Sequence, residues 1–346
     1  MKHMATMLLR RLWKTASAAA LCAAAFSQPS LAQVAPPSIL QIDLANTVLY
    51  FQDTSDISKY AAEPNVTPPA ISFRNFYRAE GIADIVAVNG QPMKGTYANA
   101  ATAMVLRTAP TPGQALADMV RQAITVTTFE ILKSDGTPIG TIVASGLFAG
   151  DAPPGSPTAA AGGNVVITGG TGAFLGARGQ MSVAPAPPGV VTQRNASITE
   201  DPANRRRNGG GTQRWIAHVI PMSAPQIVST ASGPAVFHSD FSPVMAAKPA
   251  RSGEVLIVQA TGLGPTRPGV DPGQPFPTGV ILPVNSPVAV TVNGQDAEVI
   301  NAVGWPGLVD TYRVDFRVPS GMAAGTASVQ VSAAWISGAP VSIPVQ

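Results

Sequence analysis

The stretch from Asn164 to Gly179 constrains the fold more than any other part of this 346-residue chain. The β-branched run of residues 165–168 leads into three glycines within four positions, Gly169, Gly170 and Gly172. β-branched side chains favour extended backbone, and glycine adopts positive φ without steric cost at Cβ. The sequence therefore predicts a strand, a sharp turn at these glycines and a second strand.

A dinucleotide-binding loop is the competing interpretation, because it also joins a strand to a glycine-rich turn. The short-chain dehydrogenase pattern T-G-x-x-G-x-x-G fits up to Gly172, but its last glycine would fall one residue before Gly176. That loop must also open a helix, and the prolines within residues 182–189 exclude a helix interior. The nearest downstream acids, Glu200 and Asp201, lie in a turn-rich region. These departures disfavour nucleotide binding.

Residues 169–179 read GGTGAFLGARG and resemble the dirigent signature G-G-T-G-x-F-x-x-A-R-G at every fixed position. Two weaker similarities precede it in the family's order, at residues 49–53 (LYFQD) and 95–97 (GTY). The resemblance covers residues 40–222 and implies an allene oxide cyclase/dirigent barrel, with eight antiparallel strands around an apolar cavity. We interpret the signature as structural turn residues, with Arg178 bonding turn carbonyls: Gly169, Gly170, Gly172, Phe174, Arg178 and Gly179.

The resemblance implies that acidic side chains in the cavity act on an apolar substrate without a cofactor. A buried carboxylate suits this role, because desolvation raises its pKa toward neutrality. Asp53 matches a family acid by position and is the candidate catalytic residue; the alternative is a solvated acid at a strand end. Phe51 and Tyr97 are candidate ligand-binding residues; for Tyr97 the favoured alternative is an ordinary half-buried barrel tyrosine.

The chain departs from the family just before the glycines. Dirigent proteins carry an Arg-Glu pair where this chain has Gly163 and Asn164. One cavity acid and its partner are missing, which argues against stereoselective phenoxy coupling. The expected function is a barrel cavity that binds a small apolar or phenolic compound, and that isomerises it or guides its coupling if it is an enzyme. The alternative is a non-enzymatic adhesion or interaction module at the cell surface.

Composition supports an all-β chain. Gly and Pro number 33 each and charged residues make up 12%, which favours many short strands joined by turns. We expect an eight-stranded antiparallel barrel over residues 39–222, a linker over 223–232 and an Ig-like β-sandwich over 233–346. Asn89-Gly90 and Asn293-Gly294 predict hairpins, as does the segment 134–137, and residues 110–120 form the one predicted helix.

The first predicted strand carries apolar residues at alternate positions. Ile42, Leu44, Val48 and Tyr50 fall on one period-2 face that is interrupted only by Asn46. We therefore expect all four apolar side chains to share one side of the strand.

The C-terminal part resembles the Ig-like IPT/TIG-type module of secreted soil-bacterial proteins of the Acidobacteria type. The segments that carry the resemblance are residues 235–242, 249–254, 261–265 and 312–319. It implies an accessory domain without catalytic residues. Polysaccharide binding by this domain is a further alternative, supported only by Trp305 and Trp335 as exposed-platform candidates.

Residues 1–32 have the pattern of a signal peptide, with a basic start, an apolar run over 16–26 and a small-residue site near 30–32. We therefore expect a secreted, periplasmic or cell-surface protein with no membrane span. Four of the 22 Lys and Arg residues lie in this segment, which leaves 18 basic against 19 acidic residues. That balance predicts no nucleic-acid partner.

Metal and disulfide chemistry is not indicated. Cys22, the single cysteine, lies within the predicted signal peptide, and the three histidines are far apart in the sequence. A charged cluster, Glu200 and Asp201 with residues 205–207, predicts a salt-bridged, anion-binding or simply solvated loop. No cofactor is expected, and a homo-oligomer would form through the barrel.

Overall fold

The computed structural model describes residues 38–53, 76–105, 121–148, 157, 164–221, 224–271 and 273–346. Nearly all regular structure in these ranges is β-strand, which confirms the predicted all-β class. The strands form a barrel up to residue 220 and a second sheet from residue 226, and no strand pairing joins the two. The predicted signal peptide (1–32) and the predicted helix (110–120) lie outside the described residues.

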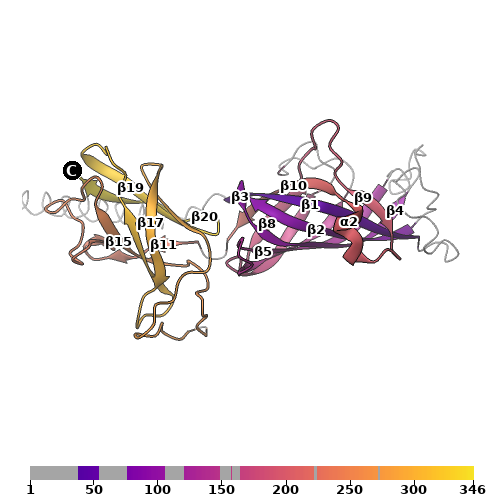
Figure 1. Ribbon diagram of the computed structural model, residues 1–346. Helices are drawn as coiled ribbons and strands as arrows, with labels where there is room; N and C mark the ends of the chain where they lie inside the picture. Colours follow the sequence, from indigo (N-terminus) through magenta and orange to yellow (C-terminus); the bar gives the residue numbers. More distant parts are fainter. Residues whose placement is uncertain are drawn as a thin grey trace, which may run out of the picture. The chain divides into compact units, whose positions relative to one another are not determined.

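Eight antiparallel strands close the barrel, because β1 pairs with both β2 and β10. In barrel order they are β1 (Ser38–Asp53), β2 (Phe76–Val88), β4 (Lys94–Val105), β5 (Arg121–Leu132), β6 (Pro138–Phe148), β7 (Asn164–Gly172), β8 (Arg178–Val183) and β10 (Gly211–Ile220). The predicted eight-stranded barrel is confirmed. Four shorter elements accompany it: β3 (Gln91–Pro92), β9 (Arg194–Ser197), the 3-10 turn η2 (Pro202–Asn204) and the single-turn helix α2 (Arg205–Asn208), which lies against the outer wall (Figure 1).

The two ends of the barrel differ in their connections. At one end, here called the hairpin end, tight turns join β2 to β3, β5 to β6 and β7 to β8. Asn89 and Gly90 have φ of 49° and 76°, the pair of positive values that a type I′ hairpin turn requires, as predicted. At the opposite end, the far end, β1, β4, β6 and β8 finish, and the chain leaves through its longer connections.

The glycine-rich stretch forms the last of these hairpins, but the turn comes later than predicted. Gly169 and Gly170 remain within β7 without positive φ, and the left-handed backbone begins at Gly172 (φ 60°) and returns at Gly176 (φ 70°). Gly170 is needed for a different reason: a Cβ there would lie 2.4 Å from the carbonyl oxygen of Phe174. The glycines therefore allow both the turn and a close backbone approach.

The turn is held by side chains of the signature. Phe174 is 1% exposed and anchors the turn in the barrel core. Arg178 donates from Nη1 to the carbonyl oxygens of Thr168 (2.7 Å) and Ala177 (3.0 Å), the interaction expected of it. No helix follows Gly172, and β7 is antiparallel to both of its neighbours. This local structure is unlike a dinucleotide-binding loop, which needs a helix and parallel strands.

A β-bulge divides β1 into two parts with opposite facing. Asn46 has φ of 52°, and three steps along β1 from Ala45 to Val48 match two steps along β2. One extra residue exchanges the faces of every side chain that follows. Leu44 therefore points into the barrel core, whereas Val48 and Tyr50 pack with Ala196 in a separate cluster. The prediction that all the alternating apolar residues of β1 share one face was wrong.

The second sheet follows the barrel and curls around a core of its own. Its elements are β11 (Gln226–Ile227), β14 (Val236–His238), β15 (Val255–Thr261), β16 (Val288–Val292), β17 (Gln295–Gly304), β18 (Thr311–Arg317), β19 (Gly325–Ala333), β20 (Ile336–Ser337) and β21 (Val341–Val345). β17 pairs with β16 over its first residues and with β18 from Glu298 onward, so it joins both halves of the sheet. Phe316 from one half and Val329 from the other are fully buried in the same core.

The predicted linker contributes to this sheet. Within residues 223–232, β11 pairs with β15, and β12 (Ser229–Thr230) pairs with β13 (Gly233–Pro234). The second sheet therefore begins at residue 226. The predicted Asn293-Gly294 hairpin joins β16 to β17, with φ of 49° and 77° at the two turn residues.

Candidate functional site in the barrel interior

The barrel interior changes character from the hairpin end to the far end. At the hairpin end it is filled by large aliphatic side chains that are at most 2% exposed: Leu40, Ile42, Ile85, Val88, Ile131, Ile139 and Val219. Packing of this kind leaves the interior of an eight-stranded barrel filled by its own side chains. The hairpin end therefore serves stability.

Aromatic side chains form the next layer. Tyr97 and Phe129 are paired across β4 and β5, with ring centroids 5.2 Å apart in an edge-to-face arrangement. Trp215 of β10 lies 5.4 Å from Phe129 and 5.8 Å from Tyr97, and Phe148 stacks on Trp215 at 5.8 Å. Four strands thus contribute one aromatic cluster to the middle of the barrel.

The Tyr97 hydroxyl is the polar group of this layer. The side chain is 7% exposed, and burial raises the pKa of Tyr97 far above its ordinary value, so the phenol stays protonated. It forms no hydrogen bond with any residue that the structure describes. Because it has no partner there, this hydroxyl can form a hydrogen bond with a ligand.

A polar layer lies above the aromatic one, toward the far end. Asn99 is directly opposite Thr127 on the neighbouring strand, and its Nδ2 donates to Thr127 Oγ1 at 2.8 Å and also to Thr125 Oγ1. Thr127 is fully buried and Thr125 is 3% exposed, which places both hydroxyls inside the barrel. Gln213 accepts a hydrogen bond from Trp215 Nε1 at 3.2 Å. The Asn99 amide oxygen has no hydrogen-bond partner among the described residues.

Small residues surround the polar layer. Ala79 and Ala101 are paired across β2 and β4, and Gly146 is opposite Thr125 on β6. Gly81 lies where three side chains meet, since a Cβ added there would be 3.2 Å from Asn99 Cβ and 3.4 Å from both Leu49 Cδ1 and Tyr97 Cε1. The interior of an eight-stranded barrel has room for its own side chains or for one small ligand, and small residues on its wall favour the ligand.

The predicted site residues fall in this half of the barrel. Phe51 is 5% exposed and lies two residues beyond Leu49 on the same face of β1, as strand alternation requires. Tyr97 belongs to the aromatic layer. Asp53 is the last residue of β1, paired through its backbone with Tyr77 at the far end, and its side chain lies outside the described part of the structure.

Sequence reasoning missed Asn99, Thr127 and Trp215. A signal for the first two exists, because Tyr97, Asn99 and Ala101 share a period-2 face, as do Thr125, Thr127 and Phe129. A polar residue in an otherwise apolar inward face is a candidate for binding. The signal is weak, since both strands also carry threonine on the outer face.

The predicted charged loop lies on the outer wall and is salt-bridged. Arg205 donates to Asp84 Oδ1 at 2.7 Å and to the carbonyl oxygen of Asn46 in the bulge at 2.9 Å. Arg206 makes two further contacts to Asp84, at 2.9 and 3.0 Å, and Asn46 Nδ2 donates to Asp84 Oδ2 at 2.8 Å. Burial alone would raise the pKa of Asp84, but these hydrogen bonds outweigh it and hold the pKa well below its usual range. We name Asp84, Arg205, Arg206 and Asn46 the bulge clamp.

Glu200 of the same loop forms an ion pair with Arg194 of β9. Arg194 Nη2 donates to Glu200 Oε1 at 2.6 Å, and a second nitrogen of the same guanidinium contacts Oε2 at 2.9 Å. Asp201 caps η2 by accepting a hydrogen bond from the backbone of Ala203. Arg194, Arg205 and Arg206 each bind a carboxylate, which favours the salt-bridged interpretation over anion binding.

Within the described ranges, no group of three or more His, Cys, Asp and Glu side chains is arranged to hold a metal ion. The same residues contain no helix of the length and apolarity needed to cross a membrane. No protein-family model matches the sequence, and no curated protein is significantly similar to it.

Proposed function

We propose that the far half of the barrel interior binds a small aromatic compound, apolar or phenolic. The observation that carries this proposal is the layering: an aromatic cluster lies directly below a set of buried hydroxyl groups and half-buried amide groups. A ligand ring would pack on Tyr97 and Trp215, and its polar substituent would bond to Thr127 or to the Asn99 amide oxygen.

The expected affinity is modest. Burying about 300 Å² of apolar ligand surface contributes roughly 7 kcal/mol at ~25 cal/mol per Å², and association costs several kcal/mol of this. We therefore expect micromolar binding at best. The resemblance to dirigent-like barrels supports isomerisation or guided coupling, with Asp53 at the far end as the acid. If turnover of such a ligand is found, Asp53→Ala should abolish it while leaving the fold intact.

A pair of matched probes tests the site. Naphthalene and naphthol share one ring system and differ by a hydroxyl group, so isothermal titration calorimetry can separate the contributions of the two layers. We expect both to bind, with naphthol tighter. Thr127→Val should weaken naphthol about threefold to tenfold, the range of one neutral hydrogen bond, and leave naphthalene nearly unchanged.

Thr128→Val is the matched control, because Thr128 lies next in sequence on the opposite face of β5. Binding of neither probe, or an equal loss of both on Thr127→Val, would contradict the proposal. Native mass spectrometry of protein purified from its culture medium provides a second test, since a retained small molecule is expected. If no ligand is found by either method, the non-enzymatic adhesion module becomes the better explanation.

A further inference from the structure

An exposed aromatic side chain in the second sheet region has an unusual backbone. Phe241 is 52% exposed and has φ of 62°, in the left-handed region. Among non-glycine residues, Asn, Asp and His are enriched in that region, and a bulky residue there is an outlier. Phe241 contributes little burial to offset this cost, so folding alone does not explain why an aromatic residue occupies the position.

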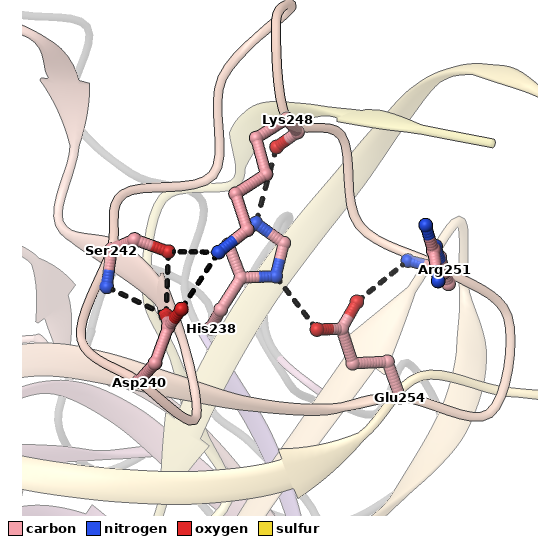
Figure 2. Close-up of polar contacts among 6 residues, drawn as sticks. All are labelled: His238, Asp240, Ser242, Lys248, Arg251 and Glu254. Atoms are coloured by element: carbon pink, nitrogen blue, oxygen red, sulfur yellow. Dashed lines mark hydrogen bonds and ion pairs between the residues drawn. The ribbon is translucent and has the colours of Figure 1, made fainter.

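A hydrogen-bonded network fixes the loop that carries Phe241 (Figure 2). Asp240 Oδ1 accepts from the backbone N–H of Ser242 at 3.0 Å and from its Oγ at 2.5 Å. Lys248 Nζ donates to Asp240 Oδ2 at 2.8 Å and to Ser242 Oγ at 2.5 Å. The backbone of Phe241 itself donates to the carbonyl oxygen of His238 at 2.9 Å. The loop is therefore held in one conformation from both sides.

His238 anchors this network in the interior. The side chain is 4% exposed, and its Nε2 lies 3.1 Å from the carbonyl oxygen of Lys248, which can only accept, so Nε2 carries a hydrogen. Its Nδ1 lies 2.6 Å from Glu254 Oε1, and Glu254 Oε2 accepts from the backbone of Arg251 at 2.9 Å. The His238 and Glu254 side chains are thus in direct polar contact. This connection ties the exposed loop to β14 and to the start of β15.

Two other segments of the chain meet the Phe241 ring. Trp305, in the turn after β17, lies with its ring centroid 6.3 Å away at an interplanar angle of 67°. Arg313 of β18 places its Cζ 5.4 Å from the centroid of the Phe241 ring. Arg313 donates to Asp315 Oδ1 through Nε at 2.7 Å, and its two terminal nitrogens have no hydrogen-bond partner among the described residues. An exposed ring, a second ring at its edge and two free donors therefore come together.

We propose that Phe241, Trp305 and Arg313 form a binding site for a sugar ring of an uncharged polysaccharide. The C–H groups of a pyranose face pack on an aromatic ring, and the sugar hydroxyls accept hydrogen bonds from planar donors. A small organic cation is a poor fit, because Arg313 already supplies the positive charge over Phe241. The ion pair with Asp315 balances the charge of Arg313, so a neutral sugar fits this site better than an acidic one.

Affinity electrophoresis of the full chain tests this site. Native gels contain hydroxyethylcellulose, laminarin or glucomannan as neutral probes, and alginate as the acidic probe. We expect retarded migration in at least one neutral gel and no retardation specific to alginate. Phe241→Gly should weaken the association about tenfold, and Trp305→Ala should also weaken it, whereas Phe241→Tyr should retain it.

The controls separate a binding role from a structural one. Phe241→Gly accepts the positive φ without strain, so it should fold and have a raised melting temperature while losing retardation. Ile281→Ala removes another exposed apolar side chain, 71% exposed in the same region, and should migrate like the wild type. Three outcomes would overturn the proposal: no retardation in any neutral gel, retardation in alginate alone, or unchanged retardation in Phe241→Gly.

Discussion

The bulge clamp on the outer wall gives the sharpest stability prediction. The Arg205 side chain is 10% exposed and that of Asp84 is 15% exposed, whereas that of Arg206 is 73% exposed. Replacing Asp84 with alanine would leave the Arg205 guanidinium buried, with the Asn46 carbonyl oxygen as its remaining partner among the contacts described. Removing one partner of a buried ion pair costs about 3–5 kcal/mol, and we expect Asp84→Ala to lower the free energy of unfolding by that amount.

Two matched variants test the origin of this loss. Arg206→Ala removes the exposed half of the clamp and should cost less than about 1 kcal/mol, as exposed ion pairs do. Asp84→Leu combined with Arg205→Met removes both buried charges, so it should cost less than Asp84→Leu alone. The barrel must be measured separately from the second sheet, because the whole chain need not unfold in one step. Urea titration with hydrogen-exchange mass spectrometry of β1 and β2 peptides provides that separation.

An Asp84→Ala protein whose β1 and β2 peptides unfold within about 1 kcal/mol of the wild type would contradict this prediction, because a buried unpaired charge would then carry no large cost. The prediction would also be refuted if Arg206→Ala and Asp84→Ala were equally destabilising. That result would assign the stabilisation to general surface charge.

Three further outcomes follow from the same structure. The pKa of Asp84 is lower in the folded chain than in the unfolded chain. The ionised carboxylate therefore stabilises the fold above the unfolded pKa of about 3.9, and this stabilisation is lost as the pH falls from there through the folded pKa. Stability should consequently depend less steeply on acid pH in Asp84→Asn than in the wild type. Gly170→Ala should destabilise the barrel by about 1–3 kcal/mol in urea titrations, because its Cβ would clash with backbone oxygens. Gly169→Ala should be tolerated, since its Cβ would meet only Arg178 Nη1 at 3.9 Å, and equal losses in the two variants would contradict this assignment. Phe241→Gly should gain about 1 kcal/mol in thermal unfolding by removing backbone strain, and a loss would show that the ring has a packing role.

The predictable parts of the fold were those set by local chemistry. Asn89-Gly90 and Asn293-Gly294 form the expected hairpins because the turn type depends on those two residues alone. The prediction of which β1 side chains point into the barrel was wrong for the residues after Asn46. A regular alternation gives no sign of an extra residue, although the Asn that interrupts the pattern is the residue that adopts positive φ.

The sites depend more on tertiary structure. Tyr97 was reached through the family resemblance, but Asn99 and Thr127 can be recognised as part of a site only when the strand register places them opposite each other inside the barrel. Trp305 was predicted as a possible polysaccharide platform without Phe241 as its neighbour, because no sequence pattern indicates that the two rings are in contact. Contacts between distant segments carry no local pattern, and sequence reasoning cannot find them.

The contrast between the two ends of the barrel has a consequence for how such a protein can change over evolution. If the far half binds a ligand as we propose, substitutions among its small and polar residues would alter ligand preference without disturbing the aliphatic packing and tight turns that hold the strands together. Insertions in the longer connections would likewise be absorbed, since strand register is set at the other end. One scaffold could in this way give rise to proteins with unrelated ligands while its core packing, its tight turns and its strand register stay the same.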